Sequence, residues 1–198
     1  MPNRATSSAD AALARLKAGN DTFVQSVNEA RQARPVERFA YPDYRPPFAS
    51  VLTCSDSRVA PEIIFHQGLG DLYVVRDAGN VVTMTERASL EFAATVFKCP
   101  LILVVGHSQC RAAQAAIDLV TGKTFQGDIQ ELASIITPAV AETKDTLGDL
   151  LENATLQNVK LSVQKLQKSE VLSGLMNAGR LTIVGAYYSV ESGQVRFL

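Results

Sequence analysis

The chain has 198 residues, of which 46% are hydrophobic and 20% charged, so it is long enough to bury one sizeable core. Its 19 Lys and Arg residues balance 20 Asp and Glu residues to a net charge of -1, which argues against nucleic acid as a partner. The apolar stretches are too short to cross a bilayer, and the first residues lack the apolar run of a signal peptide. We therefore expect a cytoplasmic protein without a membrane or nucleic-acid partner.

The first thirty residues are predicted to be helical. Leu13, Leu16 and Phe23 supply the apolar positions, and Gly19-Asn20 is expected to break the helix. A connector rich in Pro and Tyr follows at 34–47, where the prolines rule out a continuous helix. This connector is either a surface loop or an arm lying over a partner subunit.

From residue 49 onward, short apolar runs alternate with helical stretches. The runs are rich in Val, Ile and Leu and show little polar alternation, which is typical of parallel strands covered on both faces. They span 49–53, 71–76, 101–106 and 181–188. Between them, Thr83-x-x-Glu86 indicates a capping box that opens a helix, and Leu156, Val159, Val163 and Leu166 form the apolar face of another.

This alternation predicts an α/β fold with a mainly parallel central β-sheet, an antiparallel edge strand near 194–197 and flanking helices. We expect a single domain over residues 1–198. Residues 1–48 would form an N-terminal helical arm, and 49–198 the α/β core that carries the site.

Two of the predicted strands end in residues that can hold a metal. The first runs into Cys54, and the third into His107 and Cys110, with Gly106 expected to permit the turn from strand to helix. His107 and Cys110 are three residues apart, so in the first helical turn both can face one point, to which Cys54 adds a third ligand. Two thiolates and one imidazole suit Zn²⁺ and leave a fourth position for water.

Two features limit the alternatives at this site. An odd number of cysteines argues against a disulfide scaffold, and we expect Cys99 to be a core residue. A closed structural zinc site needs a fourth ligand. His66, the only other histidine, lies outside any paired spacing, whereas Asp56 could close the site.

The segments CSDSR at 54–58 and GHSQC at 106–110 resemble the two-part zinc signature of the β-class carbonic anhydrases. The similarity continues through 58–82 and 89–93, and extends to 16–20 and 183–188. The resemblance implies that Cys54, His107 and Cys110 bind Zn²⁺ and that Asp56 and Arg58 form a catalytic pair beside it. The implied reaction is attack of zinc-bound hydroxide on CO2, which gives bicarbonate and a proton.

The resemblance also implies an apolar substrate pocket and an oligomer. The matching pocket positions are Val59, Tyr73, Ala78 and Phe92. Family members form homodimers or homotetramers in which N-terminal helices embrace the partner and the pocket is shared across the interface. Tyr188 matches a family tyrosine near the last strands, and His66 is expected to be an ordinary polar residue rather than a proton shuttle.

Three positions depart from the family pattern: Arg111 replaces a Gly, Asp77 an Asn, and Arg45 a Gln of the plant-like branch. These changes keep two alternatives open, namely a carbonyl sulfide or carbon disulfide hydrolase using the same zinc site, and an inactive, zinc-stabilised assembly protein. A resting state in which Asp56 leaves Arg58 and ligates the zinc is a further hypothesis.

Overall fold

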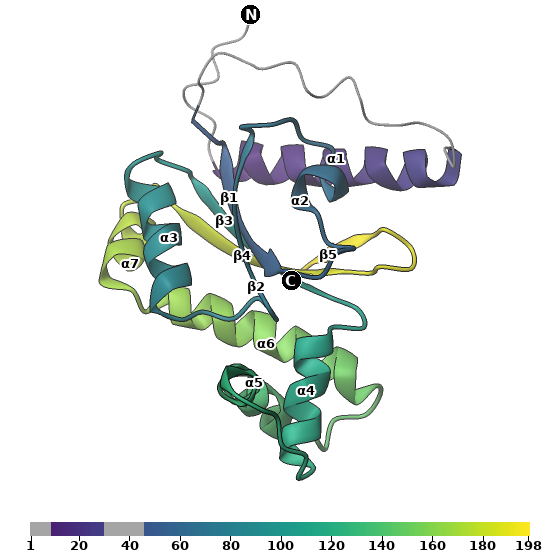
Figure 1. Ribbon diagram of the computed structural model, residues 1–198. Coiled ribbons are helices and arrows are strands. Elements are labelled where there is room, and N and C mark those ends of the chain that lie inside the picture. Colours follow the sequence, from purple (N-terminus) through teal and green to yellow (C-terminus); the bar gives the residue numbers. More distant parts are fainter. Residues whose placement is uncertain (1–8, 30–45) are drawn as a thin grey trace, which may run out of the picture.

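The computed structural model describes residues 9–29 and 46–198, and its centre is a five-stranded sheet in the order β2-β1-β3-β4-β5 (Figure 1). The strands are β1 (Ala49–Cys54), β2 (Leu72–Asp77), β3 (Leu101–His107), β4 (Thr182–Tyr188) and β5 (Val195–Phe197). The first four are parallel, and β5 runs antiparallel to β4 at one edge. The predicted fold class is confirmed, including the antiparallel edge strand.

Helices cover both faces of this sheet (Figure 1). One face packs against α1 (Ala9–Glu29) and the short α2 (Pro61–Ile64), and the other against α3 (Met84–Thr95), α6 (Leu150–Gln167) and α7 (Glu170–Asn177). Two further helices, α4 (Arg111–Val120) and α5 (Asp128–Thr143), pack against α6 beyond the carboxyl end of β3. None of the described helices is both long and apolar enough to span a membrane.

Successive residues of the central strands point to opposite faces, as the pleat of a strand requires. Val51 of β1 joins the core beneath α1, whereas Leu52 joins the core beneath α6. The polar residues of β1 are satisfied within the sheet, because Ser50 and Thr53 donate hydrogen bonds to the carbonyls of Leu101 and Val105. Both faces of the sheet are therefore buried, which explains the near-continuous apolar runs in the sequence.

The predicted helix break at Gly19-Asn20 is wrong, since α1 continues through it. At Gly19 a Cβ would lie 1.8 Å from the carbonyl oxygen of Phe65, so the missing side chain lets two backbones approach. Asn20 is buried and donates to the carbonyls of Ile64 and Gly193, at 3.1 and 3.0 Å. This pair of residues docks α1 onto the core.

The predicted capping box is confirmed at the start of α3. Thr83 accepts a hydrogen bond from the amide of Thr85, and its own amide donates to Glu86 at 2.9 Å. The predicted inner face of α6 is also in place, with Val159 and Leu166 fully buried. Most of the Pro-rich connector, including Arg45, lies outside the described residues.

Candidate functional site

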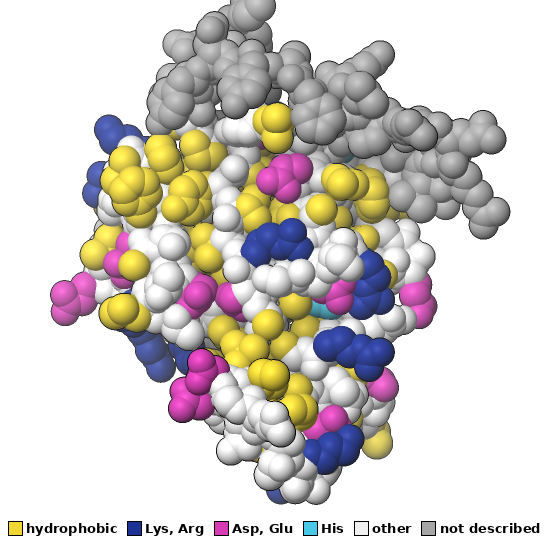
Figure 2. Space-filling model, viewed as in Figure 1, with side chains coloured by type: hydrophobic (Ala, Val, Ile, Leu, Met, Phe, Trp, Pro, Cys, Tyr) yellow, Lys and Arg dark blue, Asp and Glu magenta, His cyan; other side chains and the backbone are white. Residues whose placement is uncertain are grey.

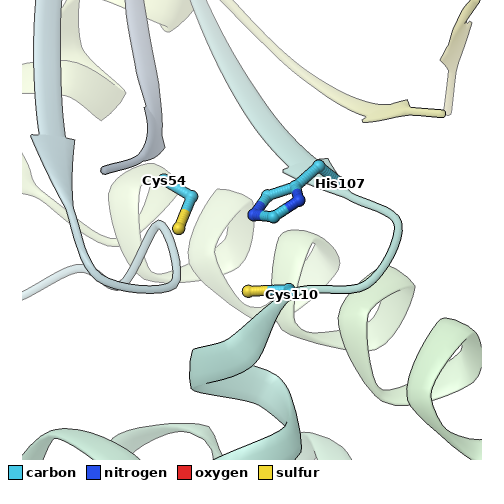
Figure 3. A group of neighbouring side chains, drawn as sticks. All are labelled: Cys54, His107 and Cys110. Carbon is cyan, nitrogen blue, oxygen red and sulfur yellow. The ribbon is translucent and has the colours of Figure 1, made fainter. Parts of the chain in front are cut away.

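The three predicted metal ligands meet at the carboxyl ends of two neighbouring strands. Cys54 is the last residue of β1, His107 is the last residue of β3, and Cys110 directly precedes α4. Between the last two, Gln109 takes a left-handed conformation with φ of 59°, which turns the chain back so that Cys110 faces the strand ends. The three buried side chains point toward one another, and their ligand atoms all lie within 4.8 Å (Figure 3).

The tautomer of His107 leaves a nitrogen available to a metal. Its Nδ1 lies 2.8 Å from the carbonyl oxygen of Ser108, and because a carbonyl can only accept, Nδ1 must carry the proton. The other nitrogen, Nε2, therefore presents a lone pair. It is buried and has no hydrogen-bond partner among the described residues, a costly arrangement unless a ligand binds there.

The two thiols are hydrogen-bonded to each other, and their pKa values shift in opposite directions. Cys54 accepts hydrogen bonds from the thiol of Cys110 and from the amide of Gly79, and these lower its pKa well below the usual value of a thiol. The same contact with Cys54, together with burial, raises the pKa of Cys110. Without a metal the pair thus holds one proton next to a thiolate. A divalent soft cation that removes this proton is the natural occupant of two sulfurs and a nitrogen, and the donor set fits Zn²⁺.

Asp56 and Arg58 form a bidentate ion pair beside the ligands. Nε and Nη2 of Arg58 donate to the two carboxylate oxygens of Asp56 at 2.9 and 2.8 Å, and the Arg58 amide donates as well. These bonds from Arg58 hold the pKa of Asp56 well below its usual range. In this arrangement both carboxylate oxygens of Asp56 accept hydrogen bonds from Arg58, and Asp56 is not part of the cluster of ligand atoms.

Two residues that sequence reasoning missed support this pair. Gln109 accepts from Nη1 of Arg58 at 2.9 Å and donates to Glu191, in the turn between β4 and β5, at 3.1 Å. Because a carboxylate only accepts, Glu191 requires the amide nitrogen of Gln109 to face it, which leaves the amide oxygen for Arg58. Gln109 lies inside the motif at 106–110, so the sequence pointed to this residue. Its contact with Glu191, 82 positions away, could not be predicted from that motif.

The four predicted pocket positions lie at two places in one chain: Val59 and Ala78 adjoin the site through Asp56 and Gly79, whereas Tyr73 and Phe92 lie together farther along the sheet. Val59 is fully buried, and Ala78 is exposed in the turn that follows β2. Tyr73 and Phe92 both contact the ring of Phe97, with centroids 5.6 and 5.4 Å apart. Tyr73 precedes the register partner of Cys54 by four residues, which places it about 13 Å along the strand from the ligands.

The other residues singled out in the sequence lie in different parts of the structure. Arg111 is exposed at the start of α4, next to the ligand Cys110, and His66 is exposed at a φ of 50° on the segment between α2 and β2. Tyr188 is buried and pairs with His107 in the sheet. Cys99 is buried and donates to the carbonyl of Pro47, and burial raises its pKa to about 12, as expected of a core thiol.

Gly106 is a strand residue and not the turn glycine that was predicted. It lies within β3 and is not among the residues of positive φ. A Cβ there would lie 2.6 Å from Cγ2 of Val159 and 3.1 Å from Cγ2 of Thr155, both on α6. The glycine therefore allows α6 to lie close against the strand that carries His107.

Asp77, where the family pattern has Asn, ends β2 and bonds the turn that follows it. Its Oδ1 accepts from the amide of Val81 at 2.9 Å, whereas Oδ2 is buried with no partner among the described residues. Burial raises the pKa of Asp77 to about 7. Asp77 thus closes the turn with a hydrogen bond and places a titratable group next to β1.

Comparisons with known proteins agree with this geometry. A family model described as carbonic anhydrase matches residues 49–195. A carbonic anhydrase of Mycolicibacterium smegmatis is 36% identical over 198 residues, covering 98% of this chain and 94% of the relative. Carbonic anhydrase 2 of Mycobacterium tuberculosis is 34% identical over 186 residues, covering 93% of this chain and 90% of the relative.

Solved structures give the same fold. The β-carbonic anhydrase CcaA superimposes with a TM-score of 0.72 at 25% identity, covering 94% of each chain. One of two tetrameric β-carbonic anhydrases from Sordaria macrospora also reaches 0.72, at 19% identity, covering 91% of this chain and 93% of its own. From its sequence, its fold and its Cys-His-Cys cluster, the chain belongs to the β-class carbonic anhydrase family.

Proposed function

We propose that the protein catalyses the reversible hydration of CO2 to bicarbonate and a proton, with Zn²⁺ held by Cys54, His107 and Cys110. The observation that carries the proposal is Nε2 of His107, which has no hydrogen-bond partner within residues 9–29 and 46–198 and lies with two cysteine sulfurs in a buried cluster. Bound Zn²⁺ would supply a Lewis acid that lets water act as a nucleophile near neutral pH.

The side chains around the cluster have distinct tasks in this proposal. Asp56 stays ionised because Arg58 lowers its pKa, so it can accept a hydrogen bond from the attacking water and orient it toward CO2. Arg58 holds both carboxylate oxygens and keeps Asp56 away from the metal. If this ion pair opened, Asp56 could occupy the fourth position and block the site, which is the closed resting state proposed from the sequence.

The predicted pocket positions also bear on the oligomeric state. Tyr73 lies on β2, the edge strand of the sheet, and Phe92 is 48% exposed on the adjacent α3. Figure 2 shows hydrophobic side chains gathered over the upper end of this helix. We infer that the edge pairs with a second copy of the chain, so that Tyr73 and Phe92 contribute to the partner's pocket. A homodimer or homotetramer follows, and the tetrameric structures from Sordaria macrospora are consistent with it.

The first experiment is stopped-flow CO2 hydration on protein of verified zinc content, with Cys110→Ser as the control. We expect fast, zinc-dependent hydration that the control loses. Carbonyl sulfide turnover is measured on the same sample. Sulfide release without CO2 hydration between pH 7 and 9 would make the protein a hydrolase on this site, and loss of stability alone on zinc removal would make the zinc structural.

A further inference from the structure

The turn after β2 connects the metal ligand Cys54 to α6, although neither the ligand motif nor the pocket positions include α6. Gly79 carries two hydrogen bonds in this turn. Its amide donates to Sγ of Cys54 at 3.3 Å, and its carbonyl accepts from Nδ2 of Asn158 at 2.8 Å. The next residue, Asn80, accepts at its carbonyl from the hydroxyl of Ser162 at 3.1 Å.

The backbone of this turn depends on outside support. Gly79 and Asn80 both take left-handed conformations, with φ of 92° and 46°. The side chain of Asn80 is buried, and neither its nitrogen nor its oxygen has a partner among the described residues. The hydrogen bonds from Asn158 and Ser162 come instead from one buried face of α6, where the two residues are 6% and 3% exposed.

We propose that Asn158 and Ser162 are positioning residues for the metal ligand Cys54, acting through the turn at 78–80. They hold the turn so that the amide of Gly79 aims at Sγ. A sulfur that accepts an amide hydrogen bond carries less negative charge, donates less to the metal and leaves it a stronger Lewis acid. This matters here because two thiolates together already offset the formal charge of Zn²⁺.

The inference rests on the metal site of the proposed function, and its test uses the metal itself and not CO2 turnover. Two variants release the turn. Asn158→Asp keeps the shape but places an acceptor against the carbonyl of Gly79, and Ser162→Ala removes only one hydroxyl. The matched control is Thr143→Val, which removes a buried hydroxyl whose hydrogen bonds among the described residues go to its own helix, at Ala139 and Val140.

The readouts are the thiolate-to-metal charge-transfer absorption of the Co²⁺-substituted protein and the Zn²⁺ affinity measured against a chelator. We expect the absorption to move to longer wavelength in Asn158→Asp, and less in Ser162→Ala, because a thiolate without the amide donor is oxidised more easily. Zinc affinity should fall about 10–100-fold in Asn158→Asp, because the loss of a fixed position for Cys54 outweighs the stronger donation of its sulfur. The Thr143→Val control should retain the wild-type absorption and affinity.

The outcomes separate the two proposals. If the wild type itself shows no thiolate charge-transfer band, the metal site of the proposed function is wrong. If the wild type shows the band and both variants match Thr143→Val in absorption and affinity, the positioning role is wrong. Ser162→Ala changes a single hydroxyl, so its spectrum decides the question should Asn158→Asp fail to fold.

Discussion

Gly106 is the residue at which the packing of the fold and the geometry of the site can be tested together. It lies in β3 directly before the ligand His107, against the side chain of Val159 on α6. In Gly106→Ala the new Cβ would lie 2.6 Å from Cγ2 of Val159, about 1 Å closer than the ~3.5–4.0 Å at which carbon atoms attract each other best. The helix or the strand must therefore move.

The cost follows from the density of the core. Both neighbours of the new methyl group on α6, Val159 and Thr155, are buried, so the misfit cannot be relieved into solvent. Overpacking of this kind costs about 1–3 kcal/mol. For a chain of this length, a loss of about 2 kcal/mol lowers Tm by about 4–8 °C. A shift of β3 also moves His107, so the affinity for Zn²⁺ should fall in parallel.

The assay is thermal and urea unfolding of Gly106→Ala, Val159→Ala and the double variant. Val159→Ala alone should cost about 1–2 kcal/mol for the lost methyl groups. In the double variant the clash is removed, so its total cost should be smaller than the sum by at least about 0.5 kcal/mol. Strictly additive costs, or a Gly106→Ala protein as stable as the wild type, would refute the close approach of α6.

Three further predictions concern α1, the turn after β2 and the ion pair. Asn20→Ala leaves two buried carbonyls and one amide without their partner, so urea unfolding should show a loss of about 2–4 kcal/mol; a loss below about 1 kcal/mol would contradict its docking role. In metal-free protein, the raised pKa of Asp77 (about 7) means that the stability its protonated form contributes is complete below pH ~4 and is lost as the pH rises to about 7. Asp77→Asn has no such titration, so its free energy of unfolding should rise relative to that of the wild type between pH 5 and pH 8. The gain has an upper limit of about 4 kcal/mol and should lie nearer 1–2 kcal/mol because the side chain is partly exposed; equal pH profiles in urea unfolding would exclude it. Arg58→Ala frees Asp56 and should lower kcat/KM for CO2 by about 10–100-fold in stopped-flow assays, and Arg58→Lys should not restore it because an ammonium cannot bind both carboxylate oxygens at once.

Much of the site could be predicted from the sequence because its residues stand at strand ends. Apolar runs without polar alternation indicated parallel strands, and parallel strands place their carboxyl ends at one edge of the sheet. Cys54, His107 and Cys110 could therefore be expected at one edge, and they meet because β1 and β3 are neighbours in the sheet. The pairing of Asp56 with Arg58 was implied by the family resemblance, and the structure shows it as a contact between residues two positions apart.

The two glycine interpretations went wrong for a common reason. Glycine is common at helix breaks and in turns, so Gly19 was expected to break a helix and Gly106 to form a turn. In the structure each lies inside a regular element, where a second segment approaches too closely for a side chain. Such an approach involves residues 46 and 53 positions away in the chain, Phe65 and Val159, and has no local signal.

By itself, then, the sequence determined the fold class and the antiparallel edge from its periodicity and the three candidate ligands from their places at strand ends, and the family resemblance implied the ion pair. Only the tertiary structure decided which groups support them. The meeting of His107 with two cysteine sulfurs, the hydrogen bond from the amide of Gly79 to Cys54, and that from Asn158 to Gly79 each require atoms from distant parts of the chain. The position of Tyr73 along its strand, away from the ligands, likewise followed only from the register of the sheet. Hydrogen bonds act over about 3 Å, so the contacts of a site are fixed only when every element has been packed.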